Sequence, residues 1–319
     1  MRLMHLPALL KKSMPSQTGI LASIIAILFS ILSQSATGAY VLQEKKWTVN
    51  GYTFTKKRFN WNGEDHGSLD VSLRGKRLLH RQAHDVWVWT RNGKGEFVEA
   101  EDQNRLSLTD LDGDGVLDFV VRQWSGGAYC CYVYEVFSLT PDCSRLWSND
   151  AGCAHLSIIE PRLTRKPKVQ AASTSKQQSF HSGNLRQSST LAMEDGVFLY
   201  WRTHVLQGPR PIAYFTGNGH GFKLNRTMML KAVDQERLRK FKSEKWTNDS
   251  EDFFIQLVYT GHAREALSLL DSLEDSERHE FAQSFMQAFK RSPFYYSIVA
   301  LNDKFEIAKL QKLAKNAGT

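Results

Sequence analysis

The feature that most restricts the fold of this chain is a short acidic segment, residues 110–118, which runs directly into the apolar residues 119–121. Its pattern is D-x-D-x-D-G-x-x-D, and its acidic residues are Asp110, Asp112, Asp114 and Asp118. Carboxylates so closely spaced repel one another unless the backbone coils around a central cation. Ca²⁺ accepts about six to eight oxygen ligands in irregular geometry, so this segment predicts a calcium site.

The spacing follows the counting of an EF-hand loop over its first nine positions. Gly115 falls at the sixth position, where the loop turns sharply, and the carbonyl of Val116 falls at the seventh. An EF-hand also needs a Glu at the twelfth position and a helix on each side. Here the twelfth residue is Val121, and the residues that follow have strand character. We therefore expect a calcium loop that connects strands.

Residues 1–39 have the order of a secretory signal peptide. A start with three basic and no acidic residues is followed by an apolar stretch at residues 20–32, and then by small and polar residues. That stretch is shorter than the roughly 20 apolar residues that cross a membrane. We therefore predict cleavage after Gly38 or Ala39, and a periplasmic or secreted protein without a stable membrane span. An uncleaved N-terminal membrane anchor is the alternative.

The charge of the chain gives little indication of a partner. There are 41 Lys and Arg residues against 33 Asp and Glu residues, and three of the basic residues lie in the leader, which leaves a net charge of +5. The basic residues are scattered along the sequence. We therefore expect ordinary solubility and no nucleic-acid partner.

From Tyr40 to about Pro161 the sequence has the character of β-strands. Short runs rich in β-branched and aromatic residues alternate with turn formers. These runs include residues 47–49, 52–55, 69–73 and 86–90. Asn-Gly pairs at 50–51, 62–63 and 92–93 predict hairpin turns, because Asn and Gly adopt positive φ at little cost. The spacing of strands and turns predicts an antiparallel meander.

A stretch at about 164–189 differs from the strands around it. Lys, Arg, Ser, Thr and Gln dominate there, and we interpret the stretch as a flexible insertion. Strand character returns at residues 196–202, 212–215 and 221–224. We therefore assign residues 40–231 to one β domain.

After about Ala232 the apolar residues recur every three or four positions, which is the period of an amphipathic helix. Short links between these segments predict helical hairpins over residues 232–319. Such helices either bind proteins or peptides or cover the sheet of the preceding domain. The predicted fold class is α+β, with an antiparallel β-hairpin or meander domain followed by an α-helical hairpin domain.

The acidic segment resembles the calcium loop of FG-GAP and VCBS-type repeats, which occur in β-propellers and in many exported bacterial proteins. The resemblance implies that Ca²⁺ is the cofactor. The implied metal ligands are the side chains of Asp110, Asp112, Asp114 and Asp118 and the carbonyl of Val116. A propeller needs several repeats, and the sequence contains one intact loop, so we expect a propeller-like but incomplete β domain.

The resemblance extends beyond the loop. Residues 125–131 read S-G-G-A-x-C-C, which is similar to a segment that follows such a loop in a group of functionally uncharacterised exported bacterial proteins. The helical part also resembles theirs, around residues 257–261 and 292–296.

Four cysteines lie close together in the sequence: Cys130, Cys131, Cys143 and Cys153. An exported protein is expected to use such a cluster for disulfide bonds. Neighbouring strand residues point to opposite faces, so Cys130 and Cys131 are not expected to pair with each other. If a hairpin turns at residues 140–142, Cys143 lies roughly 25 Å along the strand from Cys131. Cys153 is therefore the predicted partner of Cys130 or Cys131, and the partner of Cys143 stays open.

The sequence offers no clear catalytic group. His80 and His84 are four residues apart but lack the glutamate of a zinc protease helix, and we interpret them as surface residues. Residues 217–221, G-N-G-H-G, are expected to form a hairpin turn. Four tryptophans either belong to the core or stack on sugars: Trp87, Trp89, Trp124 and Trp201.

We therefore predict an exported, non-catalytic protein with a calcium-stabilised β domain and a helical interaction domain. Its expected partner is another envelope protein or a glycan. A glycan- or cell-wall-binding module is the first alternative, and exposed aromatic rings along a groove would favour it. A hydrolase is the second, and two carboxylates facing each other in a cleft would favour that.

Overall fold

The computed structural model describes residues 39–92, 96–100, 104–127, 131–159, 188–202 and 208–315. The strands in these ranges form three open antiparallel sheets, and the α-helices follow them in the C-terminal part of the chain. This arrangement confirms the predicted α+β fold class. Almost all of the predicted leader and of the predicted insertion at 164–189 lie outside the described residues. Within the ranges above, no helix is both long and apolar enough to cross a lipid bilayer.

The first sheet is a four-stranded meander in the order β1-β2-β3-β4. Its strands are β1 (Tyr40–Val49), β2 (Tyr52–Trp61), β3 (Glu64–Leu73) and β4 (Lys76–Ala83). Tight two-residue turns at 50–51, 62–63 and 74–75 connect them, and both residues of each turn have positive φ. The first two turns confirm the prediction from Asn-Gly pairs. The third has Arg74 at a φ of 50° where Asn is usual, and the sequence gives no comparable signal for it.

The central sheet has five strands in the order β6-β5-β7-β8-β9. They are β5 (Asp85–Arg91), β6 (Phe97–Glu99), β7 (Asp118–Trp124), β8 (Tyr132–Ser138) and β9 (Arg145–Gly152). The third sheet has the order β10-β11-β12-β13. Its strands are β10 (Leu156–Ile159), β11 (Thr190–Glu194), β12 (Ile212–Gly217) and β13 (Phe222–Leu224).

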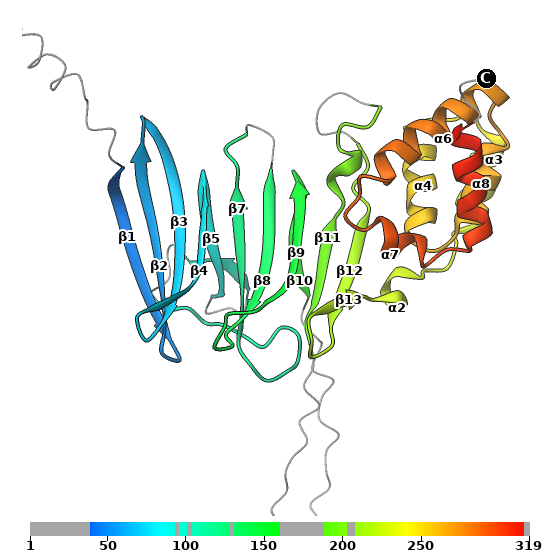
Figure 1. The fold of residues 1–319 in the computed structure, drawn as a ribbon. Coiled ribbons are helices and arrows are strands. Elements are labelled where there is room, and N and C mark those ends of the chain that lie inside the picture. The colour runs from blue at the N-terminus through cyan, green and yellow to red at the C-terminus, as the bar shows by residue number, and fades with distance from the viewer. Residues whose placement is uncertain are drawn as a thin grey trace, which may run out of the picture.

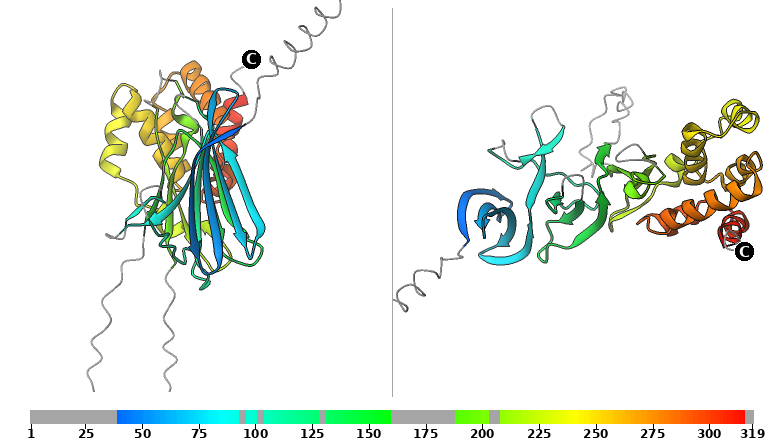
Figure 2. Two further views of the ribbon diagram at one scale, coloured as in Figure 1. Left: turned by 90° about the vertical axis from the view of Figure 1, so that its left-hand side faces the viewer. Right: turned by 90° about the horizontal axis from the view of Figure 1, so that it is seen from above.

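The three sheets follow one another along the long axis of the molecule, with the helices beyond the third (Figures 1 and 2). The central sheet is covered on both faces, as β7 demonstrates. Phe119 and Val121 belong to the core shared with the first sheet, whereas Val120 belongs to the core shared with the third sheet and the helices. Because alternate strand residues point to opposite faces, a continuous apolar run is what such a strand requires.

A buried ion pair also joins the first two sheets. The carboxylate of Glu135 in β8 accepts two hydrogen bonds from Arg81 in β4, at 2.5 and 3.0 Å. Gln123 and Arg145 of the central sheet also donate to it, at 2.9 and 3.2 Å. The side chain of Glu135 is only 4% exposed, so these donors satisfy a carboxylate that water cannot reach.

The helical part shares its core with the third sheet. Its helices are α2 (Arg226–Met229), α3 (Gln235–Ser243), α4 (Asn248–Tyr259), α5 (Ala263–Leu270), α6 (Asp275–Phe289), α7 (Tyr295–Val299) and α8 (Lys304–Lys315). A capping box begins α4, with Thr247 as the N-cap and Ser250 three residues into the helix. Phe253 and Phe285 of the helices lie in one continuous cluster with Leu191 of the third sheet.

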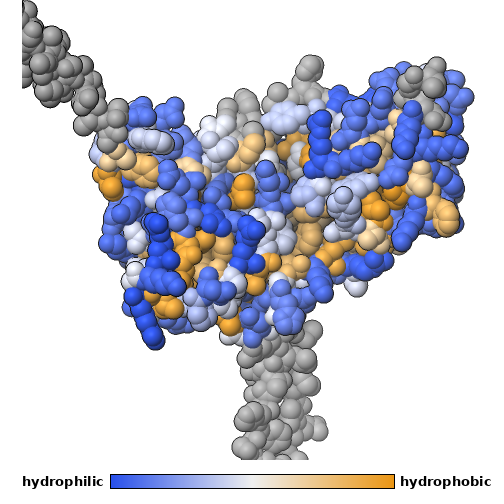
Figure 3. Space-filling view, in the orientation of Figure 1, coloured by the Kyte–Doolittle hydropathy of each residue, from blue (hydrophilic) through white to orange (hydrophobic). Residues whose placement is uncertain are grey.

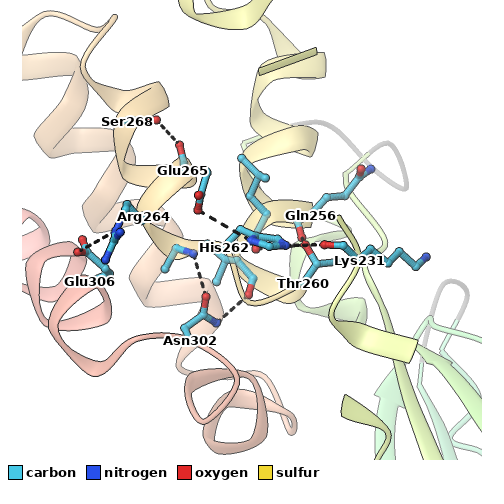
Figure 4. Close-up of polar contacts among 12 residues, drawn as sticks. Lys231, Gln256, Thr260, His262, Arg264, Glu265, Ser268, Asn302 and Glu306 are labelled. Atoms are coloured by element: carbon cyan, nitrogen blue, oxygen red, sulfur yellow. Dashed lines mark hydrogen bonds and ion pairs between the residues drawn. The ribbon is translucent and has the colours of Figure 1, made fainter. Parts of the chain in front are cut away.

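Polar side chains hold the helix connections together (Figure 4). Asn302 is buried, accepts a hydrogen bond from Ala263 N at 2.9 Å, and donates to the carbonyls of Val258 and Ile298, both at 2.8 Å. It thereby joins the end of α4, the start of α5 and α7. His262 donates to the carbonyl of Lys231 and fixes the turn between α4 and α5 to the segment that follows α2.

The strand predicted at residues 196–202 is wrong. Asp195 follows β11 and is the N-cap of a short 3-10 helix, η2 (Gly196–Phe198), because its side chain accepts a hydrogen bond from Val197 N. Phe198 and Trp201 are both buried and lie three residues apart, so the turning chain points both at the helices. The aromatic run that favours a strand on propensity serves here as a helical face.

Candidate metal centre

The acidic loop lies at one end of the central sheet and leads into β7. Its two ends are closed by a bridge in which Asp118 N donates to Thr109 O at 2.8 Å. Asp110, Asp112 and Asp118 each offer one carboxylate oxygen, and these three oxygens lie within 4.8 Å of one another. Two oxygens bound to one Ca²⁺ are at most about 5 Å apart, because each Ca–O distance is about 2.3–2.6 Å. One cation can therefore contact all three carboxylates.

Asp114 is not part of this group of three. Its Oδ1 accepts a hydrogen bond from Val116 N at 2.6 Å. The sequence predicts Asp114 and the Val116 carbonyl as further ligands, and both contributions stay predictions.

Backbone N–H groups hold the carboxylates in place. Asp110 accepts from Gly113 N at 2.7 Å and from Gly115 N at 2.8 Å. Gly115 has a φ of 95°, a conformation that only glycine adopts easily, as expected for the sharp turn of a cation loop. These hydrogen bonds fix the direction of the Asp110 carboxylate before any ion binds.

Asp118 is the most constrained member of the group. It is 1% exposed, and its Oδ2 accepts from Leu111 N and Asp112 N at 2.7 and 3.2 Å. Its Oδ1 and the facing Ser138 Oγ are also buried, and neither makes a hydrogen bond of good geometry within the described ranges. A buried carboxylate oxygen without a donor costs free energy unless a cation lies beside it.

The pKa values of Asp118 and Asp112 reflect the same free-energy cost of burying a charged carboxylate. Burial is the main cause that raises the pKa of Asp118 to about 7, and the Asp112 carboxylate acts in the same direction. N–H donors from Leu111 and Asp112 and the nearby Ser138 hydroxyl act against this shift. Burial also raises the pKa of Asp112, against an N–H donor from Gly221. A divalent cation between these groups would favour their ionised forms.

Residues 217–221, the turn between β12 and β13 of the third sheet, donate hydrogen bonds to the acidic loop. Gly221 N donates to Asp112 Oδ2 at 2.9 Å, and Gly219 N donates to the Asp112 carbonyl at 2.8 Å. A Cβ atom on Gly217 would lie 2.3 Å from Asp112 Cα. The segment G-N-G-H-G is thus a turn, as predicted, and it also receives the acidic loop. Its alternating glycines were the available signal for this second role.

The loop touches both cores of the molecule. Leu111 is fully buried in the core that the central sheet shares with the third sheet and the helices. Val116 and Leu117 pack against the core shared with the first sheet. A change in the loop therefore reaches both faces of the central sheet.

The S-G-G-A-x-C-C segment follows β7 and is described except for residues 128–130. Ser125 and Cys131 exchange two hydrogen bonds, Ser125 N to Cys131 O at 3.1 Å and Cys131 N to Ser125 Oγ at 3.0 Å. A Cβ atom on Gly126 would lie 2.9 Å from the ring of His84. His84 is only partly exposed, because its ring packs between this glycine and Trp124. His80 is exposed and contacts Asp70.

The positions of three cysteines can be compared with the predicted disulfide. The fourth, Cys130, lies outside the described residues. The antiparallel register ends at the pair Tyr132 and Gly152, and Cys131 and Cys153 are the residues next to this pair in the sequence. The structure joins Cys131, Cys143 and Cys153 by no disulfide to one another. Cys143 is buried in the core of the first two sheets, and burial raises the pKa of its thiol to about 11.

The aromatic residues that the glycan alternative requires are largely covered. Trp201 is buried, and the other three tryptophans singled out in the sequence are half-buried. The Arg122 guanidinium lies 4.1 Å from the centroid of the Trp87 ring, and His84 packs edge-on at 4.8 Å from Trp124. Trp89 packs edge-on at 5.9 Å from Tyr134. These four residues do not form an exposed surface for stacking, and glycan binding stays a prediction without their support.

Residues 257–261 and 292–296 are the helical segments that resemble those of the exported bacterial proteins. Both segments contact one buried carboxylate, that of Asp195. Tyr259, in the first segment, and Ser292, in the second, both donate their hydroxyl to Asp195 Oδ2. Asp195 also accepts from Val197 N at 3.1 Å. Burial raises the pKa of Asp195, while its hydroxyl donors act against the shift. This cluster joins the third sheet to α4 and to the α6–α7 connection.

Comparison with models of known protein families, with curated proteins and with solved structures finds no match to this chain.

Proposed function

We propose that this protein is an exported, non-catalytic protein in which one Ca²⁺ ion fastens the β sheets together and the helices form an interaction domain. The observation that carries the calcium part is Asp118 Oδ1, a buried atom beside two further carboxylates, to which no described residue makes a hydrogen bond of good geometry. Such an atom is costly to leave unsatisfied, and a bound cation removes that cost. The leader at residues 1–39 supports export to the periplasm or beyond.

The chemistry of the site favours Ca²⁺ over other cations. All three ligands offered are carboxylate oxygens, which suit a hard cation and not a soft one. Mg²⁺ needs near-octahedral geometry and usually keeps several waters. Asp112 and Asp118 are each 1% exposed, which leaves little room for those waters. Ca²⁺ tolerates irregular geometry and replaces water with protein oxygens more readily.

The burial of the site supports a structural role for the ion. A catalytic ion needs an open coordination position that faces a cleft. Asp112 is instead covered by N–H donors from Gly219 and Gly221 of the third sheet. Because Leu111 and Leu117 carry the loop into the two cores, an ion that fixes the loop stabilises both faces of the central sheet.

Calorimetric titration of the mature protein with Ca²⁺ and, separately, with Mg²⁺ tests the proposal. We expect a single calcium site that binds Ca²⁺ more tightly than Mg²⁺. Asp118→Asn should abolish this binding, because the neutral amide replaces the buried charge. Asp142→Asn, an exposed change in the β8–β9 turn, should bind Ca²⁺ like the wild type. Absence of calcium binding to the wild type, or equal binding by Asp118→Asn, would refute the calcium site.

A further inference from the structure

A groove of about 630 Å³ lies on the helical part between α5 and α8, with α6 at one end. Leu267, Leu270 and Leu313 provide its apolar lining. On the face of the helices shown in Figure 3, apolar residues lie among hydrophilic ones. The residues that line this groove belong to α5 and its C-terminal end, to α6 and to α8, and none of them belongs to the acidic loop.

Basic side chains outnumber acidic ones around the groove. Four basic residues line it, Arg264, Arg278, Lys309 and Lys312, against Asp271 and Glu306. Glu306 has a side chain only 9% exposed and is held by Lys309 at 3.1 Å and by Arg264 at 3.7 Å, a pair that Figure 4 shows. The side chains of Arg264 and Lys309 are still 74% and 64% exposed, so both can contact a further anion.

An exposed aromatic ring extends the same face of α8. Phe305 is 77% exposed, and it lies four residues before Lys309 and seven before Lys312. Residues at these spacings lie on one face of a helix. The face that carries the basic rim therefore also presents a large apolar side chain to solvent, which is a feature of protein interaction sites.

We propose that this groove binds an acidic, apolar-containing segment of a partner protein. The carboxylates of the segment would meet Arg264, Lys309 and Lys312, and its apolar side chains would meet the leucine lining and Phe305. Charge complementarity selects such a segment over a basic one. The apolar lining selects a protein segment over a polyanion that offers charge alone. The inference rests on the proposed role of the helices as an interaction domain and does not depend on the calcium site.

A direct test uses fluorescence anisotropy with a labelled peptide in which pairs of Glu alternate with pairs of Leu, at about 14 residues or roughly 20 Å as a helix. A peptide with Lys in place of Glu is the first control, and a polyglutamate peptide of equal length is the second. At low salt, about 50 mM, the Glu-Leu peptide should bind the mature protein about tenfold more tightly than either control.

Substitutions test whether the Glu-Leu peptide binds in this groove. Lys309→Glu with Lys312→Glu should weaken binding of the Glu-Leu peptide by about tenfold or more, and Phe305→Ala should weaken it several-fold. Lys240→Glu with Lys242→Glu, on the exposed side of α3, should leave it unchanged. Equal binding of all three peptides, no binding of the Glu-Leu peptide, or equal losses in the α8 and α3 variants would each overturn the proposal. Calcium-dependent melting of the α8 variant should match the wild type, which separates this outcome from that of the calcium site.

Discussion

Gly217 lies against the acidic loop and leaves no space there for a larger side chain. A Cβ atom there would lie 2.3 Å from Asp112 Cα, a separation that real Cβ atoms essentially never show. We expect Gly217→Ala to push the loop away from the third sheet, to lower the free energy of unfolding by about 1–3 kcal/mol and to weaken calcium binding. Urea unfolding and calorimetric titration measure the two effects.

Gly219→Ala is the matched control for this change. Gly219 has a φ of +77°, and a Cβ atom there would meet nothing within 4 Å. The alanine should therefore cost about 1–2 kcal/mol through its left-handed backbone alone. Calcium affinity should stay close to that of the wild type, because Gly219 N still donates to the Asp112 carbonyl. Unchanged calcium affinity in Gly217→Ala would contradict the role assigned to this turn.

Asp195 makes the stability of the protein depend on pH. Its pKa is raised in the folded protein, chiefly by burial. A carboxyl of this kind stabilises the fold fully below its unfolded pKa of about 4, and that contribution is lost as the pH rises through the folded pKa. Asp195→Asn cannot ionise, so its stability relative to the wild type should rise as the pH increases from about 4 to 8. Urea unfolding of both proteins in calcium measures the difference, and a difference that is constant with pH would contradict this assignment.

At the scale of elements, the β8–β9 register makes the disulfide prediction more specific. The register ends at the Tyr132–Gly152 pair, and continuing it by one step would place Cys131 opposite Cys153. Cys143 lies in the core at the other end of the hairpin. We therefore expect oxidation to join Cys131 to Cys153, which leaves Cys130 and Cys143 as thiols. Thiol titration of the denatured, unreduced mature protein should detect two thiols, and one in Cys143→Ser. Four thiols in the wild type would reject the disulfide.

The elements also show what the sequence could predict and what it could not. The acidic loop is recognisable because its carboxylates are contiguous, and the covered central strand is recognisable because residues 119–121 are all apolar. The turn at 74–75 escapes prediction because Arg74 adopts a positive φ without being Asn or Gly. The hydrogen bonds between residues 217–221 and Asp112 join positions about a hundred residues apart in the sequence, so no local pattern specifies them. The aromatic run at 196–202 leads to a wrong strand prediction. The helical spacing of its aromatic residues has an effect on the fold only when the helices pack on them.

At the scale of the whole molecule, the acidic loop lies where all three sheets can be affected at once. It leads into β7, whose residues belong alternately to the two cores of the molecule. It also carries hydrogen bonds to the third sheet through Asp112. Without a cation the carboxylates of this loop repel one another, and no described residue gives the buried Asp118 Oδ1 a hydrogen bond of good geometry. A calcium ion bound in this loop is therefore expected to stabilise the whole folded chain and not the loop alone.

Thermal unfolding of the mature protein in calcium and in a chelator tests this expectation most directly. An ion that binds the folded state alone adds RT ln(1 + [L]/Kd), about 2.7 kcal/mol at a hundredfold excess over Kd. The wild type should therefore melt at a lower temperature in the chelator, and Asp112→Ala should melt at nearly the same temperature in both conditions. If the wild type melts identically with and without calcium, a structural role for the ion is contradicted.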